Sequence, residues 1–411
     1  MKNIVILGAG FAGLRAAFGL EKKFRKDKNI ALTLIDKNDY QLFTPNLYRI
    51  AAKDEGLVSM EQIKNSISLP LAKILKNKKI NLIKGEVVGL NFEHQRLQLL
   101  GRQVGYDFLV LAMGSRPEFF NMEGASKYGL QLKTIKDALR IRNALEFAVE
   151  THRMDVKKKN LRVVVAGGGY SGVELAGELK LFLDFLAWKN EYPREKIELE
   201  IIEANPKLVD GFSGQMSDDA YNRLSELGVR AVLSNRISQV DNHFIYTMAG
   251  EKISYDVLIW TTGVRAHQIF CDRKILLDNR DRVCVNEYLL AQEHQNIFVL
   301  GDMAAVADSR GKSVPQSAQD ALDQADYLSY VLPYVMKNKK PPEVYRPKLH
   351  GFIVNIGGKW AIMKSSGIYL TGWLAYFIDQ LAHVRYYAGL VGWFKAFKCV
   401  FRQMEVFERN D

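Results

Sequence analysis

The chain has 411 residues and a basic balance, with a formal net charge of +11 at pH 7. Hydrophobic residues make up 48% of the sequence and charged residues 25%, which is typical of a globular protein. A chain of this length is expected to form two or three domains with sizeable cores. The longest stretch without a charged residue, 365–378, is shorter than the roughly 20 apolar residues that a membrane-spanning helix needs. We therefore expect no segment to cross a membrane.

Two glycine-rich turns predict two dinucleotide sites. Their glycines stand at matching spacings: Gly8, Gly10 and Gly13 in the first turn, and Gly167, Gly169 and Gly172 in the second. Each turn follows a short apolar run, which is typical of a strand buried on both faces of a parallel sheet. Glycine is needed because bare backbone must approach a pyrophosphate at the start of a helix. The first run also resembles a signal peptide, but glycines interrupt it, so we expect the first strand there.

An acidic residue ends the second strand of each predicted unit. The run 32–35 ends at Asp36, and the run 199–202 ends at Glu203. A carboxylate in this position accepts hydrogen bonds from ribose hydroxyls. Glu203 would also repel a 2′-phosphate, so NADH is favoured over NADPH. The alternative is that both are ordinary acidic strand ends.

Further strands are predicted between and after the two turns. After the first turn they are Ala31–Ile35, Ile80–Lys84, Val87–Asn91, Arg96–Leu99 and Phe108–Leu111. The second unit repeats this plan and closes on the strand 257–260, which Thr262 and Gly263 follow. Later, the apolar run 296–300 leads to Gly301 and Asp302, where a carboxylate can lie beside the sugar-alcohol chain of a flavin. A plain acidic turn is the alternative.

Thiol relays and metal sites have no support in the sequence. The cysteines Cys271, Cys284 and Cys399 are far apart and form no CxxC pair. A redox dithiol is therefore excluded as an electron relay. The seven histidines show no spacing typical of metal ligands, and we expect no metal site.

The order of several motifs resembles that of the two-dinucleotide-binding-domain flavoproteins. The motifs are GAGFAGL, LxxAMGSRP, GGGYSGVE, IWTTGV and NIFVLGDMA, and the match extends over nearly the whole chain. Residues 34–48 are further similar to the segment after the second strand in the type II NADH dehydrogenase family. In cysteine-dependent relatives this segment would carry the redox thiol, and here it carries none.

The resemblance implies an α/β fold class with two Rossmann-like domains, the second inserted in the first, and a C-terminal amphipathic helical region at the membrane surface. The implied FAD-binding domain comprises 1–115 and 265–350, the NAD(P)H-binding domain 116–264, and the membrane-anchoring region 351–411. FAD would occupy the first turn and NADH the second. The residues implied to bind these cofactors are Gly8, Gly10, Phe11, Ala12, Gly13, Asp36, Lys37, Thr44, Pro45, Ala112, Gly114, Arg116, Gly301 and Asp302 for FAD, and Gly167, Gly169, Tyr170, Ser171, Gly172, Glu203, Thr262 and Gly263 for NADH.

The resemblance also implies catalytic roles on the acceptor side of the flavin. It places Glu174 near the nicotinamide–flavin stack, where a buried carboxylate of raised pKa suits acid–base work; a Glu favoured by the helix dipole is the alternative. A family helix near the quinone begins with Ala-Gln-x-Ala-x-Gln. Here Gln316 matches, Pro315 replaces the first Ala, and Asp320 takes the second Gln position beside Gln319. We expect Pro315 in the first helical turn, and solvent-facing glutamines are the alternative.

The C-terminal segment combines bulky apolar residues with basic ones. One stripe at helical spacing predicts a shared face of one helix: Leu390, Trp393, Phe394, Phe397, Val400, Phe401 and Met404. A preceding stripe has the same period: Trp373, Leu374, Phe377, Ile378, Leu381 and Val384. Lys395, Lys398 and Arg402 flank the later stripe. This combination favours a helix lying in an anionic membrane surface, and a helix packed into the core is the alternative.

These features predict an NADH:quinone oxidoreductase, peripheral on the cytoplasmic side of a prokaryotic inner or plasma membrane. It would pass hydride from NADH to FAD and two electrons to a quinone, without pumping protons. The runner-up is a soluble NAD(P)H-dependent flavoprotein reductase that feeds a small iron–sulfur protein. A flavoprotein whose basic surface binds nucleic acid has no supporting motif, and we expect no nucleic-acid partner. The sequence leaves open the quinone, the tolerance of NADPH and the oligomeric state, a homodimer included.

Overall fold

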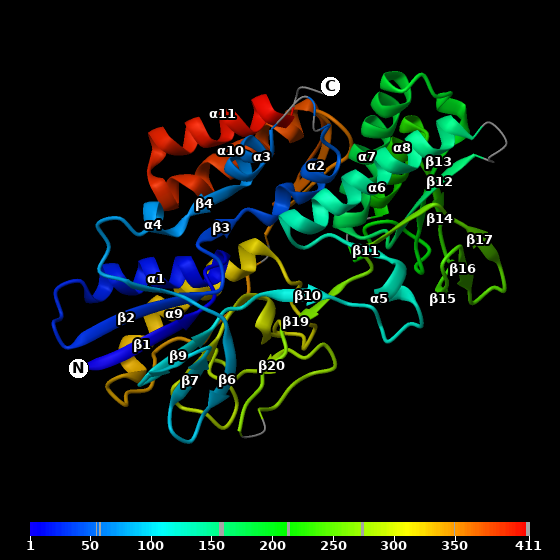
Figure 1. Ribbon diagram of the computed structural model, residues 1–411. Helices are drawn as coiled ribbons and strands as arrows, with labels where there is room; N and C mark the ends of the chain where they lie inside the picture. The colour runs from blue at the N-terminus through cyan, green and yellow to red at the C-terminus, as the bar shows by residue number, and fades with distance from the viewer. Residues whose placement is uncertain are drawn as a thin grey trace. The chain divides into compact units, whose positions relative to one another are not determined.

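The computed structural model describes residues 1–54, 56, 59–155, 160–211, 214–272, 275–348 and 350–407. The chain divides into two compact units, each assembled from segments that are separated in the sequence (Figure 1). The first unit comprises Met1–Leu42, Leu69–Arg116 and Val264–His350, and the second comprises Phe43–Ser68, Pro117–Gly263 and Gly351–Asp411. Each unit is built on one five-stranded parallel sheet.

The sheet of the first unit has the strand order β21-β9-β1-β2-β5. Its strands are β1 (Lys2–Leu7), β2 (Ile30–Asp36), β5 (Asn81–Lys84), β9 (Phe108–Leu111) and β21 (Ile297–Val299). Helix α1 (Phe11–Phe24) packs against β1 and β2, and it also packs against α9 (Ala318–Val335). All side chains of β9 and the last four of β1 are buried, which is why these strands are continuous apolar runs.

The sheet of the second unit repeats this plan in the order β11-β18-β12-β13-β14. Its strands are β11 (Leu130–Gln131), β12 (Leu161–Ala166), β13 (Ile197–Ile202), β14 (Arg230–Val232) and β18 (Val257–Trp260). Helix α7 (Tyr170–Lys189) packs against β12 and β13, and α6 (Ile135–Met154) packs against β12 and β18. Trp260 is buried in the core at the end of β18 and donates through Nε1 to the Glu118 carbonyl (2.9 Å).

Shorter elements complete both units. The first unit adds β3 (Tyr40–Leu42), α4 (Leu71–Ile74), an antiparallel sheet of β6 (Val87–Asn91), β7 (Arg96–Leu99) and β8 (Arg102–Gly105), then β19 (Val264–Ala266), β20 (Val283–Cys284), η3 (Gly301–Met303) and β22 (Ala304–Ala305). The second adds η1 (Thr44–Asn46), α2 (Leu47–Ala51), α3 (Met60–Ile67), α5 (Ala125–Tyr128), η2 (Arg194–Lys196), α8 (Gly214–Leu227) and an antiparallel sheet of β15 (Ile237–Val240), β16 (Phe244–Thr247) and β17 (Lys252–Ser254). Strands β4 (Ser68–Pro70) and β10 (Ser115–Pro117) contain the sequence positions at which the chain leaves one unit and enters the other.

The chain ends in a small antiparallel sheet and two helices of the second unit. The sheet contains β23 (Phe352–Asn355), β24 (Ala361–Ser365) and β25 (Ile368–Gly372), and the helices are α10 (Trp373–Val391) and α11 (Trp393–Phe407). The two helices pack side by side, as the red and orange ribbons show (Figure 1). Gly392 separates them with a left-handed φ of +83°, a conformation that ends a helix readily at glycine.

This helix break corrects part of the sequence prediction. Leu390 belongs to α10, so it does not share one helix with the stripe that begins at Trp393. The predicted stripes also divide by burial, because Val384 and Val400 face the interior. The remaining large apolar residues of the two stripes are mostly exposed: Trp373, Leu374, Phe377, Leu381, Trp393, Phe394, Phe397 and Phe401. The alternative that these aromatics form the core is therefore wrong.

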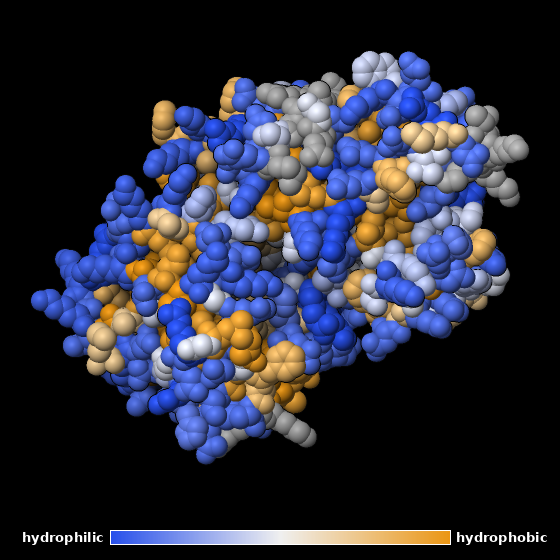
Figure 2. Space-filling model, viewed as in Figure 1, coloured by the Kyte–Doolittle hydropathy of each residue, from blue (hydrophilic) through white to orange (hydrophobic). Residues whose placement is uncertain are grey.

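The strand predictions agree closely with the structure. Val87–Asn91, Arg96–Leu99 and Phe108–Leu111 match β6, β7 and β9 in both bounds, and the others are within one residue. The N-terminal apolar run is strand β1, as predicted. In the part of the chain that the structure describes, no helix has both the length and the apolar character needed to cross a bilayer. The face shown in Figure 2 is largely hydrophilic, with apolar patches between charged side chains.

Candidate cofactor and redox site

The first glycine turn lies at the carboxyl edge of the sheet in the first unit. The last residue of β1 pairs with the last residue of β9, so both strands end at the same level. Asp36 ends β2 beside them and accepts hydrogen bonds from the Ala9 N–H (2.7 Å) and the Asn38 N–H (2.7 Å). Strand β1 is central in this sheet, with β2 paired on one side of it and β9 on the other. Parallel sheets bind ligands at such an edge.

The turn after β21 stands at the same edge. The hydroxyl of Ser115 donates to Asp302 Oδ2 (2.5 Å), and the side-chain amide of Gln316 donates to the Asp302 carbonyl (2.9 Å). The Gly301 N–H donates to Gln324 Oε1 (2.7 Å). The structure therefore brings together Gly301, Asp302 and Gln316, three residues that the sequence singles out.

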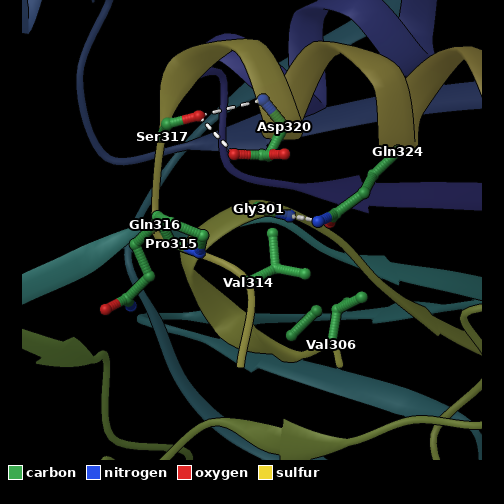
Figure 3. Close-up of a pocket in the computed structure, with 9 residues that line it drawn as sticks. Gly301, Val306, Val314, Pro315, Gln316, Ser317, Asp320 and Gln324 are labelled. Carbon is green, nitrogen blue, oxygen red and sulfur yellow. Dashed lines mark hydrogen bonds between the residues drawn. The ribbon is translucent and has the colours of Figure 1, made fainter. Parts of the chain in front are cut away.

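A pocket next to this turn is lined by the start of α9 and the segment before it (Figure 3). Ser317 caps α9 by accepting from the Asp320 N–H (3.1 Å), and the helix begins at Ala318. Pro315 therefore precedes the cap and is not in the first helical turn, which corrects the sequence prediction; a serine satisfies the end of a helix, and proline cannot. Burial raises the pKa of Asp320, and the Ser317 hydroxyl opposes this rise. Gln319 is exposed.

The second glycine turn repeats the first. Glu203, after β13, accepts hydrogen bonds from the Gly168 N–H (2.5 Å) and the Asn205 N–H (2.8 Å). After β18, the Thr262 hydroxyl donates to the Glu118 carbonyl (3.2 Å). The acidic strand end and the closing turn therefore meet the glycine turn at one edge of the second sheet, as they do in the first unit.

Glu174 lies on α7, two residues after Gly172, the last glycine of the second motif. Its Oε1 accepts a hydrogen bond from the Asn355 N–H of β23 (3.3 Å). Desolvation raises the pKa of Glu174 to about 8; the Asn355 N–H lowers it, the Asp379 carboxylate raises it and the Arg49 guanidinium lowers it. Glu174 is therefore mostly protonated at neutral pH and can donate a proton.

Residues 2–325 match the sequence profile of the pyridine nucleotide-disulphide oxidoreductases. The chain belongs to this family.

Relatives within this family are similar to the chain over nearly its whole length. A type II NADH:quinone oxidoreductase from Staphylococcus saprophyticus is 25% identical over 403 residues, which cover 97% of this chain and 98% of the relative. One from Haemophilus influenzae is 27% identical over 398 residues, 88% of this chain and 86% of the relative. The match with the Staphylococcus relative leaves only 3% of this chain uncovered, so it includes most of the C-terminal region as well as the two glycine turns.

Solved structures share the fold. The structure of NDH2 from Plasmodium falciparum in complex with NADH has a TM-score of 0.83 at 21% identity. The matched region covers 99% of this chain and 98% of the NDH2 chain. The structure of the sulfide:quinone oxidoreductase from Aquifex aeolicus has a TM-score of 0.76 at 18% identity. The matched region covers 95% of this chain and 92% of the Aquifex chain. At these identities the structural likeness establishes the fold alone.

The turns of this pyridine nucleotide-disulphide oxidoreductase fit dinucleotides. A Cβ on Gly13 would collide with the carbonyl oxygen of Gly8, so α1 can start this close to β1 only with glycine there. A Cβ on Gly10 would meet no described atom within 4 Å, which leaves the space beside the turn open for a ligand. In the second turn, a Cβ on Gly172 would likewise collide with the carbonyl oxygen of Gly167, and a Cβ on Gly169 would meet no described atom within 4 Å. FAD and NADH are the dinucleotides expected at these turns.

Some predicted cofactor residues have other surroundings. Lys37 and Pro45 are exposed, and Thr44 begins η1 in the second unit. Arg116 forms an ion pair with Asp281 (3.0 Å). Cofactor roles for these residues stay predictions.

The sequence reasoning missed several residues that hold the site. Ser115 lies inside the motif LxxAMGSRP, and its hydroxyl group, which can donate to a carboxylate, is the signal that could identify it. Gln324 follows Asp320 by one helical repeat, which places both on one side of α9. Asp379 and His383 have the same spacing on α10, and this i,i+4 pair of polar residues beside the apolar stripe is the signal that could identify them.

The glycine turn offers a matched pair of variants. We expect Gly13→Ala to lower the free energy of unfolding by about 1–3 kcal/mol, because the new methyl group collides with backbone that must shift. Gly10→Ala should unfold close to the wild type when FAD is removed, but it should bind FAD weakly. Thermal unfolding with and without FAD measures both effects. Normal FAD affinity in a folded Gly10→Ala variant would show that FAD does not use this turn.

Proposed function

We propose that this protein is a type II NADH:quinone oxidoreductase. It transfers a hydride from NADH to FAD and passes two electrons to a membrane quinone without pumping protons. The observation that carries this proposal is similarity over nearly the whole chain to enzymes of that name, together with two dinucleotide turns of one design. The family also includes disulphide reductases, but Cys271, Cys284 and Cys399 are far apart in the sequence and form no CxxC pair.

FAD binds at the first turn and NADH at the second. When bound, FAD accepts a hydride and releases two electrons. Asp36 and Glu203 each accept two backbone N–H groups, which fixes the carboxylates and leaves lone pairs for ribose hydroxyls. The negative charge of Glu203 opposes a 2′-phosphate, so the enzyme prefers NADH to NADPH.

The start of α9 serves the acceptor side of the flavin. The N-terminal end of a helix carries partial positive charge, which favours a negatively charged partner there. Gln316 is held by the Asp302 carbonyl directly before this helix, and Asp320 lines the pocket next to it (Figure 3). We assign Gln316 and Asp320 to contact with the acceptor. Gln319, which is exposed, has no contact that supports a role and stays a prediction.

Glu174 supplies a proton when the quinone is reduced. Forming a quinol requires two protons as well as two electrons, and a carboxyl group with a pKa of about 8 holds its proton at neutral pH. General acids work best when their pKa lies near the working pH. Glu174 meets this condition.

The helices α10 and α11 bind the membrane surface. Trp393, Phe394, Phe397 and Phe401 expose between 55% and 86% of their surface along α11. Soluble proteins rarely expose so many large apolar side chains in one place. Lys395, Lys398 and Arg402 are exposed on the same helix, and each basic group near an anionic surface adds roughly 1 kcal/mol. A helix of this kind lies in the plane of the membrane.

This attachment makes the enzyme peripheral and gives it access to a quinone dissolved in lipid. We place it on the cytoplasmic face, where its substrate NADH is available. A homodimer stays a prediction.

The function is tested on protein purified in mild detergent. We expect a flavin spectrum and FAD on extraction, with rapid NADH oxidation in the presence of menaquinone or ubiquinone analogues. Ferredoxin should accept electrons slowly at best. Rapid transfer to ferredoxin with no quinone reduction would contradict the proposal and favour a soluble reductase.

Glu174 is expected to act in one half-reaction. In stopped flow, Glu174→Gln should slow the oxidation of reduced flavin by quinone about 10- to 100-fold, while flavin reduction by NADH changes little. In the wild type the quinone step should slow as the pH rises through about 8, since the donor loses its proton there, and Glu174→Gln should remove this dependence. Equal slowing of both half-reactions would assign Glu174 to NADH binding or to structure.

Membrane binding separates into two contributions. Reversing Lys395, Lys398 and Arg402 to Glu should weaken binding to anionic liposomes mainly at low salt, since such attraction is screened over about 10 Å at 0.1 M. Changing Trp393 and Phe397 to Ser should weaken binding at any salt concentration. Liposome sedimentation measures both.

The matched control is Trp188→Ser, because Trp188 is 69% exposed but lies on α7. It should sediment with liposomes like the wild type. All variants should reduce a water-soluble quinone. Unchanged binding of the Trp393 and Phe397 double variant would show that α11 is not the anchor.

A further inference from the structure

Buried polar and charged side chains from four elements of the second unit lie around Glu174. They come from α2, α7, β23 and α10, and each is less than a tenth exposed: Arg49, Glu178, Asn355, Asp379 and His383. Burying so many charged groups is costly unless they are paired. The proposed function uses only Glu174, so the other groups need an explanation.

Asp379 links Glu174 to a histidine. The carboxylate of Asp379 accepts from Asn355 Nδ2 (3.1 Å), and the backbone N–H of Asn355 donates to Glu174 (3.3 Å). One residue of β23 therefore holds both carboxyl groups. On the other side, Asp379 Oδ2 lies 3.5 Å from His383 Nε2, one helical turn further along α10. Gln380 also donates to Asp379 (3.2 Å).

His383 is arranged to pass a proton. Its Nε2 faces the Asp379 carboxylate, so a neutral ring carries its hydrogen there and presents a lone pair at Nδ1. Within the described residues, Nδ1 is buried and has no hydrogen-bond partner. A structural histidine would normally bond through both nitrogens. His152 does so: its Nδ1 contacts the Ala148 carbonyl at 2.9 Å while its Nε2 lies 3.5 Å from Asp256.

We propose that Asp379 and His383 are positioning residues that return a proton to Glu174 after each turnover. This inference rests on the proposed function, because it assumes that Glu174 gives up a proton to the quinone. The pair adds a source for that proton inside the second unit.

The transfer moves one proton and no electrons. When a transient opening admits solvent to the buried Nδ1 of His383, a proton forms an N–H bond at Nδ1, and the N–H bond at Nε2 breaks as Asp379 forms an O–H bond. Asp379 then loses this proton as Glu174 forms its O–H bond. At the end Asp379 is again a carboxylate and Glu174 is again protonated. His383 recovers its first tautomer by exchanging protons with solvent.

The charges around the pair favour this direction. Burial lowers the pKa of His383, Asp379 raises it and Arg49 lowers it, so the ring is neutral at pH 7 and holds a proton only briefly. The same Asp379 raises the pKa of Glu174 and Arg49 lowers it. Other titratable groups lie beside Arg49 and Glu174. Glu178, Tyr48 and Tyr376 raise the pKa of Arg49. The charge of Glu174 in turn raises the pKa of Tyr170. The final acceptor of the proton is Glu174, which binds it more tightly than His383.

The kinetic test uses His383→Ala in the holoenzyme. Oxidation of reduced flavin by quinone should slow at least about tenfold, while flavin reduction by NADH stays within twofold of the wild type. Added imidazole should restore the quinone step, because it can replace the missing ring. His152→Ala is the control, since it removes a buried His–Asp contact of equal length and should leave both half-reactions unchanged.

Two outcomes would overturn the proposal. The first is an unchanged quinone step in His383→Ala. The second is equal slowing of both half-reactions without rescue by imidazole, which would indicate a structural role. If His383→Ala does not fold, His383→Gln replaces it, and there an unchanged quinone step overturns the proposal while selective slowing supports it.

A spectroscopic test does not depend on turnover. The infrared carbonyl band of protonated Glu174, assigned by its loss in Glu174→Gln, should titrate at lower pH in Asp379→Asn, because a neighbouring negative charge is gone. An unshifted titration would show that Asp379 does not act on Glu174. If the wild type reduced no quinone but this shift appeared, the proposed function would fail while the coupling of the two carboxyl groups stood.

Discussion

The close approach of a helix to the strand before it is the constraint on which both units depend. At Gly13 and Gly172 a single added methyl group would strike the carbonyl of the preceding turn. Because the helices start so close, their N-terminal N–H groups lie at the edge where three strands of each sheet end. The acidic strand ends, the closing glycine turns and the Gly301–Asp302 turn all gather at these edges. Binding of two different dinucleotides follows from one backbone geometry used twice.

Helix α10 joins two environments that soluble proteins usually keep apart. Its outer side exposes Trp373, Phe377 and Leu381, and its inner side buries Asp379 and His383. The outer side departs from the ordinary pattern, in which polar residues face water, and the inner side buries Asp379 and His383 among the apolar residues Ala375, Tyr376 and Val384. The lipid surface that we propose on the outer side would remove the cost of the exposed aromatics. On the inner side, Asn355 connects Asp379 to the carboxyl group that we assign to quinone reduction.

The sequence was a good guide wherever a backbone requirement selects a residue type. Glycines at the turns, carboxylates at strand ends and β-branched runs in the sheets predicted both units, because few other residues satisfy those positions. It was a poor guide to contacts between distant segments. Nothing in the local pattern pairs Asn355 with Asp379, or Ser115 with Asp302, since those partners are set by packing. The apolar stripe continues across Gly392 and therefore does not predict the helix break there, and the glutamine pattern around Pro315 does not predict that Ser317 caps α9.

The last helix is fastened to the second unit by polar bonds as well as by apolar packing. The buried ammonium group of Lys53 donates to the Phe407 carbonyl (2.9 Å), and the buried Gln403 amide donates to the Ser66 carbonyl (2.7 Å) and the Tyr387 hydroxyl (2.7 Å). Removing α11 would take partners away from groups that cannot reach water. The helix is therefore a member of the folding unit and not a detachable tail. A shortened chain made for crystallisation would lose stability along with the lipid contact that we propose, so a water-soluble form has to be sought through surface substitutions that keep the full length.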